Sequence, residues 1–264
     1  MNCNFRKLEF NIIKKIVEQA GKIILTNSKI KKWELKKDFT PVTEVDILAN
    51  KFIEKKLRFF FPNIKIISEE ENIVSINTNT FFLVDPLDGT KEFIKGGRNF
   101  TVNIALIENS QAKYGFIFVP KAEELYWNDN ENAYLKTNYQ EKKLAVSFNG
   151  TLNIELSQTH LDAKTKFFLD KLNNVAQKNY ISSSLKLCNV AKGISSFYPR
   201  FSKTMEWDIA AGHSILKNAG GNIFDLDGKT LMYNKYKYIN NGFLAFAGKK
   251  LPDEIIQLLK DENY

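Results

Sequence analysis

Apolar side chains recur every three or four residues in two stretches near the start of the chain. The first stretch covers residues 8–24 and the second covers about 44–60, just before Pro62. This spacing places apolar side chains on one face of an α-helix. We therefore expect two amphipathic helices, the second of them ended by the proline.

From residue 64 onward the pattern changes to short apolar runs separated by turn residues. Runs of this kind are typical of buried strands. They lie at residues 64–67, 81–84, 101–107, 114–119 and 124–127. Together with the two helices, they predict an N-terminal half in which helices pack against an antiparallel sheet.

After the turn dipeptide Asn149-Gly150, strand-like and helix-like segments alternate to the end of the chain. We expect strands at 152–160, 178–181, 195–200, 222–224 and 243–247, and helices at 162–172, 185–193, 208–219 and after Pro252. Alternation of this kind is typical of a layered α/β arrangement. The sequence thus predicts an α/β protein with an α+β part at 1–146 and an α/β part at 147–264.

Composition fits a soluble globular protein. Of the 264 residues, 44% are hydrophobic and 26% are charged. No apolar run reaches the ~20 residues that a membrane span needs, and the N-terminus lacks the apolar core of a secretory signal. With only Cys3 and Cys188, the chain has neither a disulfide framework nor a cysteine zinc site. We expect a cytoplasmic protein with no integral membrane segment, and leave peripheral membrane association open.

The formal net charge of +8 allows three interpretations. It is compatible with a nucleic-acid-binding surface, with attraction of a small polyanionic substrate, or with a lysine-rich solvated surface. The densest cluster, KIKKWELKKD at 29–38, lacks the glycine-flanked aromatic residues of an RNA-recognition sheet. Charge alone therefore does not choose among the three.

Three acidic residues lie at the end of apolar runs or just past them: Glu69, Asp85 and Asp88. Functional loops collect at the carboxyl ends of strands, so these carboxylates are candidates for one site. Pro86 restrains the turn between the two aspartates, and the carbonyl of Leu87 is free to point the same way. Carboxylate and carbonyl oxygens are hard ligands, which suit Mg²⁺ better than zinc.

The same motif continues into Gly89, Thr90 and a helix-like KEFI segment. The start of a helix presents unpaired N–H groups, which bind anions such as phosphate. A structural alternative remains at each position. The DPLDGT segment is also ordinary turn chemistry, Asp208 is a plausible helix N-cap, and Asp46 is a plausible first-turn acid.

Seven motifs in order carry a resemblance to a known family: FTPVTEVD, ISEEE, DPLDGTKEFI, FTVNIALI, SSSLKLCNVAKG, FYPRF and EWDIAAGH. From about residue 36 to residue 247 the chain resembles the inositol monophosphatase superfamily of Mg²⁺-dependent, lithium-sensitive phosphatases. The KEF triplet after DPLDGT resembles its 3'(2'),5'-bisphosphate nucleotidase branch. The fold that the resemblance implies is the layered αβαβα sugar-phosphatase fold of inositol monophosphatase and fructose-1,6-bisphosphatase.

The resemblance also implies roles for individual residues. Glu69, Asp85 and the Leu87 carbonyl match ligands of a first metal, with Asp85 shared between two metals, and Asp88 and Asp208 match ligands of the second. A third Mg²⁺ near Glu69 is plausible by analogy. Asp46 and Thr90 match the pair that orients and deprotonates the attacking water. Lys36 or Lys37 matches a basic residue over the metal site.

A second phosphate requires an anion pocket of its own. By resemblance, the residues that build it are His160, Ser183, Ser184, Lys186 and Arg200, with Gly89, Thr90 and Asp208 nearer the metals. Hydroxyl, ammonium and guanidinium groups are suited to binding phosphate oxygens. Other interpretations are a strand-end histidine for His160, a helix cap for the serines and an Arg200 that snorkels from a strand. His213 and Cys188 are given no chemistry.

The expected reaction is hydrolysis of the 3'-phosphate of adenosine 3',5'-bisphosphate to AMP and phosphate, which by resemblance clears a by-product of sulfate assimilation. The nearest alternative is an inositol monophosphatase-like sugar phosphatase with the same metals. An alternative of another class is a basic nucleic-acid-binding module in which the acids are only caps. The expected partner is a small bisphosphorylated nucleotide and no nucleic acid; the oligomeric state stays open.

Overall fold

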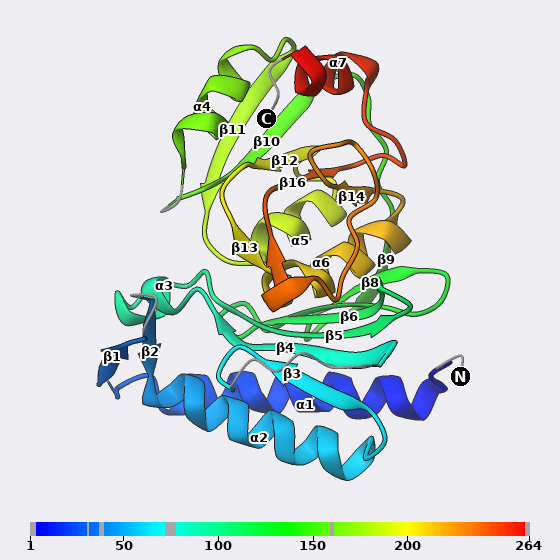
Figure 1. Ribbon diagram of the computed structural model, residues 1–264. Helices are drawn as coiled ribbons and strands as arrows, with labels where there is room; N and C mark the ends of the chain where they lie inside the picture. The colour runs from blue at the N-terminus through cyan, green and yellow to red at the C-terminus, as the bar shows by residue number, and fades with distance from the viewer. Residues whose placement is uncertain (1–3, 31, 37–39, 72–77, 159–160, 262–264) are drawn as a thin grey trace.

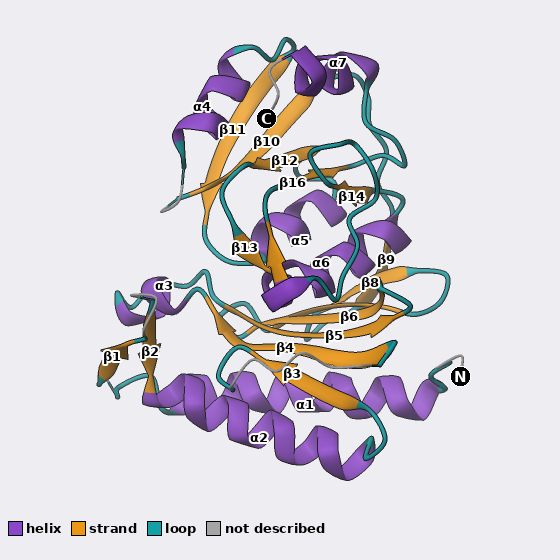
Figure 2. Ribbon diagram, viewed as in Figure 1, coloured by secondary structure: helices purple, strands orange, loops and turns teal. Residues whose placement is uncertain are grey.

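A computed structural model describes residues 4–30, 32–36, 40–71, 78–158 and 161–261. Helices and sheets alternate in five layers, in the order helix, sheet, helix, sheet, helix (Figure 1). The layered αβαβα architecture expected from the sequence is therefore confirmed. Figure 2 makes the alternation visible, with the two sheets separated by a pair of helices.

The larger sheet has seven strands in the order β3-β4-β5-β6-β7-β8-β9. Their bounds are β3 Lys65–Ser68, β4 Thr80–Asp88, β5 Thr101–Glu108, β6 Gln111–Val119, β7 Glu124–Asn128, β8 Ala133–Lys136 and β9 Glu141–Leu144. The pairing is antiparallel except between β3 and β4, which are parallel. The expectation of an antiparallel sheet was wrong at this pair, where Lys65 to Ser68 lie opposite Phe81 to Val84 in a parallel register. The sequence pattern also missed β8 and β9.

Two long helices cover one face of this sheet, α1 at Lys7–Thr26 and α2 at Glu44–Phe60. Their buried side chains, such as Ile13, Val17 and Ile53, join those of Val102 and Ile104 on the underside of β5 in one apolar cluster. The 3.6-residue spacing that predicts the helices is thus the spacing that this contact requires.

The other face of the seven-stranded sheet is covered by α5 (Leu185–Ala191) and α6 (Glu206–Ala219). Helix α6 is buried on almost every side because it lies between the two sheets. It approaches β6 so closely that a Cβ on Gly115 would lie 2.1 Å from the Ala211 carbonyl oxygen. Only glycine fits there, and this contact fixes α6 against the sheet.

The second sheet has the order β11-β10-β12-β16-β14. Its strands are β10 Leu152–Ser157, β11 Val175–Ile181, β12 Phe197–Arg200, β14 Asn222–Phe224 and β16 Phe243–Phe246. Helices α4 (Ala163–Asp170) and α7 (Asp253–Asp261) cover its outer face through Phe168 and Ile255. The predicted strands and helices of this half are confirmed within a few residues.

Smaller elements complete the chain. Strands β1 (Trp33–Leu35) and β2 (Pro41–Thr43) pair near the start of α2, and β13 (Thr204–Met205) pairs with β15 (Ile239–Asn240) next to the short helical turn η1 (Tyr236–Tyr238). Helix α3 (Thr90–Ile94) follows β4 directly. The sequence pattern predicted α3 alone among these. Within the described ranges, no helix combines the length and hydropathy that a membrane crossing needs.

The predicted boundary between residues 146 and 147 falls in the connection from β9 to β10. Elements from both sides of it contact the central layer, since α5 and α6 belong to the C-terminal part but cover the N-terminal sheet. The division into two units stays a prediction.

Candidate active site

A cleft of about 1230 Å³ opens between the seven-stranded sheet and the C-terminal layers. Most of the residues that the sequence nominated line it: Lys36, Glu69, Asp85, Leu87, Asp88, Gly89, Thr90, Ser183, Ser184, Lys186, Arg200 and Asp208. Asp46 lies one layer behind, bonded to Thr90. His160 and Lys37 lie outside the described residues. The fold therefore gathers into one cleft side chains that are far apart in the sequence.

The parallel pairing of β3 with β4 brings the first acids together. Ser68 lies opposite Val84, so Glu69, which follows β3, and Asp85, which is within β4, lie side by side at the same end of the sheet. Beyond Asp85 the register shifts before pairing resumes at Asp88. In this irregular turn the backbone N–H of Leu87 donates to Asp85 Oδ1 at 3.1 Å. The proline-containing DPLD sequence thus presents two carboxylates and a carbonyl from one strand end.

Helix α6 brings the third acid to the same place. Carboxylate oxygens of Glu69, Asp85 and Asp208 all lie within 4.8 Å of one another. Asp85 is only 1% exposed, and the three side chains come from the turn after β3, from β4 and from α6. Buried, clustered carboxylate oxygens are a donor set for a hard divalent cation.

The electrostatics of Asp85 and Asp208 are dominated by burial and by the negative charge of neighbouring acids. Burial, and then the negative charges of Asp88 and Glu69, raises the pKa of Asp208 to about 8. Burial, and then Glu69, Asp88 and Asp208, raises the pKa of Asp85 well above its usual range. A carboxylate surrounded by carboxylates favours its neutral form unless a cation arrives. The cluster therefore has a strong intrinsic preference for bound positive charge.

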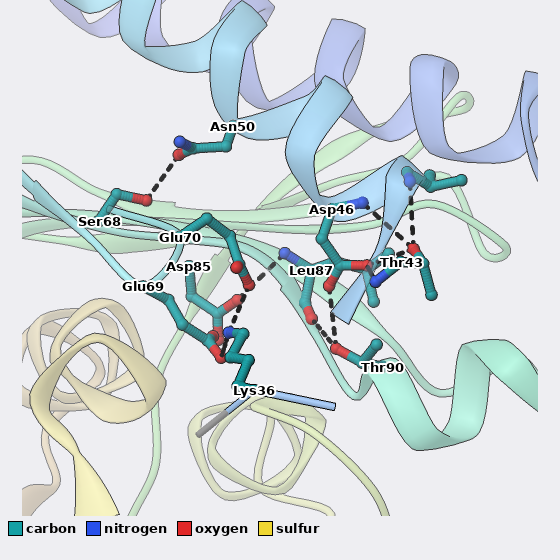
Figure 3. Close-up of polar contacts among 11 residues, drawn as sticks. Lys36, Thr43, Asp46, Asn50, Ser68, Glu69, Glu70, Asp85, Leu87 and Thr90 are labelled. Atoms are coloured by element: carbon teal, nitrogen blue, oxygen red, sulfur yellow. Dashed lines mark hydrogen bonds and ion pairs between the residues drawn. The ribbon is translucent and has the colours of Figure 1, made fainter. Parts of the chain in front are cut away.

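One lysine reaches the cluster from outside (Figure 3). Lys36 Nζ lies 2.7 Å from Glu69 Oε1 and 2.7 Å from Glu70 Oε1. Burial lowers the pKa of Lys36, but the two carboxylates outweigh burial and raise it above its usual value. Burial, and then Glu69, raises the pKa of Glu70 to about 7. The sequence reasoning chose Glu69 from the ISEEE motif and left out Glu70, although adjacent glutamates at a strand end were a signal for both.

Thr90 and Asp46 form a pair beside this cluster. The Thr90 hydroxyl lies 3.0 Å from Asp46 Oδ1 and 3.1 Å from the Leu87 carbonyl oxygen. The other Asp46 oxygen accepts the N–H of Thr43 at 2.9 Å and also the Thr43 hydroxyl. Asp46 is thus a first-turn acid of α2, in a capping box with Thr43, and a partner of Thr90 at the same time. Burial raises its pKa, although the bonds from Thr43 and Thr90 oppose the rise.

Gly89 makes the turn from β4 into α3 possible. Its φ of +96° lies in the left-handed region, where a side chain would be strained. A Cβ at this position would also lie 3.0 Å from the Asn99 carbonyl oxygen. Thr90 follows as the first residue of α3, so the glycine aims the threonine hydroxyl at Asp46.

Asp88 is held by the start of α5. Its Oδ2 atom lies 2.6 Å from both the backbone nitrogen and the hydroxyl oxygen of Ser184. The Ser184 hydroxyl is also 2.7 Å from the Asp208 carbonyl oxygen. Asp208 itself accepts the N–H of Met205 at 2.9 Å, from the third position of α6. The N-cap of that helix is Met205, so the alternative that Asp208 is the N-cap was wrong.

Basic and hydroxyl groups line the opposite wall of the cleft. Arg200, at the end of β12, has neutral partners: the Ser202 hydroxyl, the Tyr198 hydroxyl and the Lys203 carbonyl. Among the described residues, no carboxylate lies within ion-pair distance of its guanidinium. Lys186 bonds to the backbone carbonyls of Ile181 and Ser183. This wall therefore carries two cationic side chains, and in the described part of the chain neither forms an ion pair.

Ser182 was not among the nominated site residues. Its hydroxyl is buried against the cleft and lacks a hydrogen-bond partner in the described part of the chain. A run of three serines before a helix was the available signal, but a run does not tell which hydroxyl stays free.

His213 lies outside the cleft, as expected of a structural histidine. Its two ring nitrogens lie 2.8 Å from the Tyr233 hydroxyl and 2.9 Å from Asn222 Oδ1. Burial lowers its pKa to about 4, so the ring is neutral at physiological pH.

A five-layered αβαβα fold with clustered carboxylates and a basic wall in one cleft defines the class of divalent-metal-dependent phosphatases. The model of the inositol monophosphatase family matches residues 7–264, and the chain belongs to this family, whose members depend on divalent metal.

Two curated relatives and one solved structure belong to a particular branch of the family. The chain is 41% identical over 219 residues to the 3'(2'),5'-bisphosphate nucleotidase CysQ of Buchnera aphidicola, covering 80% of this chain and 82% of that protein. It is 37% identical over 235 residues to CysQ of Salmonella typhimurium, covering 86% and 95%. The crystal structure of CysQ from Bacteroides thetaiotaomicron superposes with a TM-score of 0.80 at 31% identity, covering 92% and 99%. The branch indicated by the sequence motifs is confirmed.

Proposed function

We propose that this protein hydrolyses the 3'-phosphate of adenosine 3',5'-bisphosphate, giving AMP and phosphate, with Mg²⁺ as its metal. The observation that carries the proposal is the meeting of Glu69, Asp85 and Asp208 in a cleft whose opposite wall holds Arg200. An acidic cluster suits a cation, and a basic wall suits a second phosphate. Relatives named as 3'(2'),5'-bisphosphate nucleotidases favour this substrate over an inositol phosphate. The role that we propose in the cell is disposal of this nucleotide during sulfate assimilation.

The residues present fit two Mg²⁺ ions. Glu69, Asp85 and the Leu87 carbonyl would hold one, and Asp85, Asp88 and Asp208 would hold the other. All are hard oxygen donors, and the raised pKa values of Asp85 and Asp208 reflect the missing positive charge. A third, looser ion would lie near Glu69 and Glu70. When bound, such ions neutralise charge on the phosphoryl group and make water a better nucleophile.

Thr90 and Asp46 orient the attacking water. Because the Thr90 hydroxyl hydrogen is directed at Asp46 Oδ1 or at the Leu87 carbonyl, its oxygen lone pairs face the cleft and can accept a hydrogen from water. Asp46 then takes up the proton through Thr90. Its raised pKa makes it a better base than an exposed aspartate.

The second phosphate binds at the basic wall. Arg200 provides a fork of N–H donors, Ser183 a hydroxyl, and Lys186 positive charge. We include His160 in this pocket by family resemblance. Ser184 helps indirectly, since its N–H and hydroxyl are occupied by Asp88. Lys36 closes the metal side of the cleft, and the backbone at Gly89 faces the reacting phosphate.

A phosphate-release assay tests the proposal. The substrates are adenosine 3',5'-bisphosphate, 3'-phosphoadenylyl sulfate and inositol 1-phosphate, each with Mg²⁺ and with EDTA. We expect Mg²⁺-dependent release from the bisphosphate nucleotide with the highest kcat/KM. A higher kcat/KM for inositol 1-phosphate would contradict the proposed substrate and support the inositol monophosphatase-like alternative. Salt-sensitive binding to polynucleotides without any phosphate release would instead support the nucleic-acid-binding alternative.

A further inference from the structure

Asn103 is a polar residue in the middle of the buried strand β5. Its neighbours Val102 and Ile104 face the α1 and α2 helices, while Asn103, Ala105 and Ile107 face the central helix layer. The side chain is 1% exposed and does not line the cleft. In the antiparallel register it lies opposite Asp85, so the two side chains share one face of the sheet.

The Asn103 amide contacts both parts of the Asp88 anchor. Its Nδ2 atom lies 2.8 Å from Ser184 Oγ and 3.4 Å from Asp88 Oδ2. Donation to Ser184 Oγ occupies a lone pair of that oxygen and leaves its single hydrogen for an acceptor. Asp88 Oδ2 is one such acceptor, at 2.6 Å. A rotated amide would place its oxygen against the carboxylate, which is repulsive.

All the protein donors to Asp88 converge on one oxygen. Asn103 and Ser184 contact Oδ2, whereas no donor among the described residues contacts Oδ1. One carboxylate oxygen is thus fixed to the protein and the other is left for the cleft. We propose that Asn103 is a positioning residue that, with Ser184, orients Asp88 to bind the divalent cation.

The amide is not there for stability alone. Its Oδ1 atom is buried and unpartnered in the described part of the chain, which is a cost that an apolar side chain of the same shape would avoid. Asn128 differs in this respect: it is a fully buried residue at the end of β7, and both its oxygen and its nitrogen are bonded. The two asparagines therefore make a matched pair.

The inference rests on the proposed function, and its test reads metal binding without substrate. Thermal unfolding is followed during Mg²⁺ titration of the wild type, Asn103→Leu and the control Asn128→Leu. We expect Asn103→Leu to keep the metal-free Tm and to need about 10–100 times more Mg²⁺ for half of the Tm shift. Asn128→Leu should lose Tm and keep the wild-type Mg²⁺ half-saturation. At saturating Mg²⁺, Asn103→Leu should keep the nucleotide KM.

An unchanged Mg²⁺ half-saturation in Asn103→Leu, or an equal change in Asn128→Leu, would overturn the proposal. Asn103→Ser, whose side chain is too short to reach Asp88, carries the same test if the leucine variant does not fold. The double variant with Ser184→Ala should weaken Mg²⁺ binding by less than the two single effects combined, because both residues belong to one network of bonds to Asp88. If the wild type binds Mg²⁺ but does not hydrolyse the nucleotide, the proposed activity is wrong, while the role of Asn103 in Mg²⁺ binding is still tested by the titration.

Discussion

Glu206 and Asp208 lie two residues apart in the first turn of α6, both buried, and they have opposite surroundings. Glu206 is 0% exposed and accepts the N–H groups of Asn234 and Lys235 at 2.8 and 3.0 Å. The Lys235 ammonium lies 2.7 Å from it. Asp208 accepts one backbone N–H, and its next neighbours are the acids Asp88 and Glu69.

The difference shows that burial alone does not identify a functional acid. Glu206 has every partner it needs from its own chain and holds the loop at Asn234 and Lys235 onto α6. Asp208 has a pKa raised to about 8 because its charge is buried and repelled. One carboxylate stabilises the folded chain by itself, whereas the other becomes favourable when a cation binds.

The largest effect should come from Asp208→Asn. The substitution keeps the side-chain shape but removes a charge that we assign to the metal site. The kcat should therefore fall at least ~100-fold, since loss of a residue that only supports a metal ligand already costs up to about that much. The metal-free Tm should be equal or higher, because repulsion is relieved. Phosphate release and thermal unfolding in EDTA measure the two effects. Asp227→Asn, at an exposed turn, is the control and should change neither.

Arg200→Ala should come next. It removes a cleft cation that has neutral partners, and a charged hydrogen bond contributes about 1.5–3 kcal/mol. The KM for the bisphosphate nucleotide should rise about 10–100-fold while kcat changes less. Steady-state kinetics give both constants. An unchanged KM would show that the second phosphate binds elsewhere.

Glu206→Gln tests whether Glu206 contributes to folding stability alone. It weakens charged hydrogen bonds to Lys235 and Asn234, so the free energy of unfolding should fall by about 1.5–3 kcal/mol. Urea unfolding should give the same loss in EDTA and in Mg²⁺. A loss confined to the Mg²⁺ condition would mean that Glu206 belongs to the metal site and would end the contrast with Asp208.

For one titrating group and one pH unit, the pH dependence of stability should be the smallest effect. The folded-state pKa is raised to about 8 for Asp208 and about 7 for Glu70, and burial and the neighbouring Glu71 raise that of Glu54 in α2 to about 7. These raised pKa values give stability that is lost as pH rises through them. Burial lowers the pKa of His213 from 6.5 to about 4, so its contribution makes stability rise with pH, but only below pH 6.5. Between pH 6.5 and 8, metal-free stability should therefore fall, by up to ~1.4 kcal/mol per pH unit for each group.

Urea unfolding across that range, in EDTA and in saturating Mg²⁺, measures this slope. Metal bound as proposed would take the place of the proton on Asp208 and would lie near Glu70, so the fall should become smaller in Mg²⁺. Equal slopes in the two conditions would indicate that these acids do not contact the metal.

Sequence reasoning located the acids because each one interrupts an apolar run at a place where a strand ends. Asp85 and Asp88 stand out for this reason, and the family motifs connected them to Asp208. The layered fold followed from helical and strand periodicities that tertiary packing preserves. The short pairs β1–β2 and β13–β15 were missed because two or three residues carry no periodicity.

Contacts between distant segments could not be predicted in the same way. FTVNIALI contains an asparagine inside a buried apolar strand, which is an unusual residue there, but its partners Ser184 and Asp88 are fixed only by tertiary structure. Likewise, the parallel pairing of β3 depends on how the chain returns after residue 69. Local pattern gives the residue types, and packing decides which atoms meet.

Asp46 has one further consequence for anyone who alters this protein. One of its oxygens accepts hydrogen bonds from Thr43 at the N-terminus of α2. The other accepts the Thr90 hydroxyl beside the cleft. Selection for a more stable α2 helix and selection for a higher kcat would therefore act on the same side chain. Substitutions at exposed positions of α2 can raise thermal stability without touching the cleft. At Asp46, a substitution that stabilises the helix would also change the rate of the reaction.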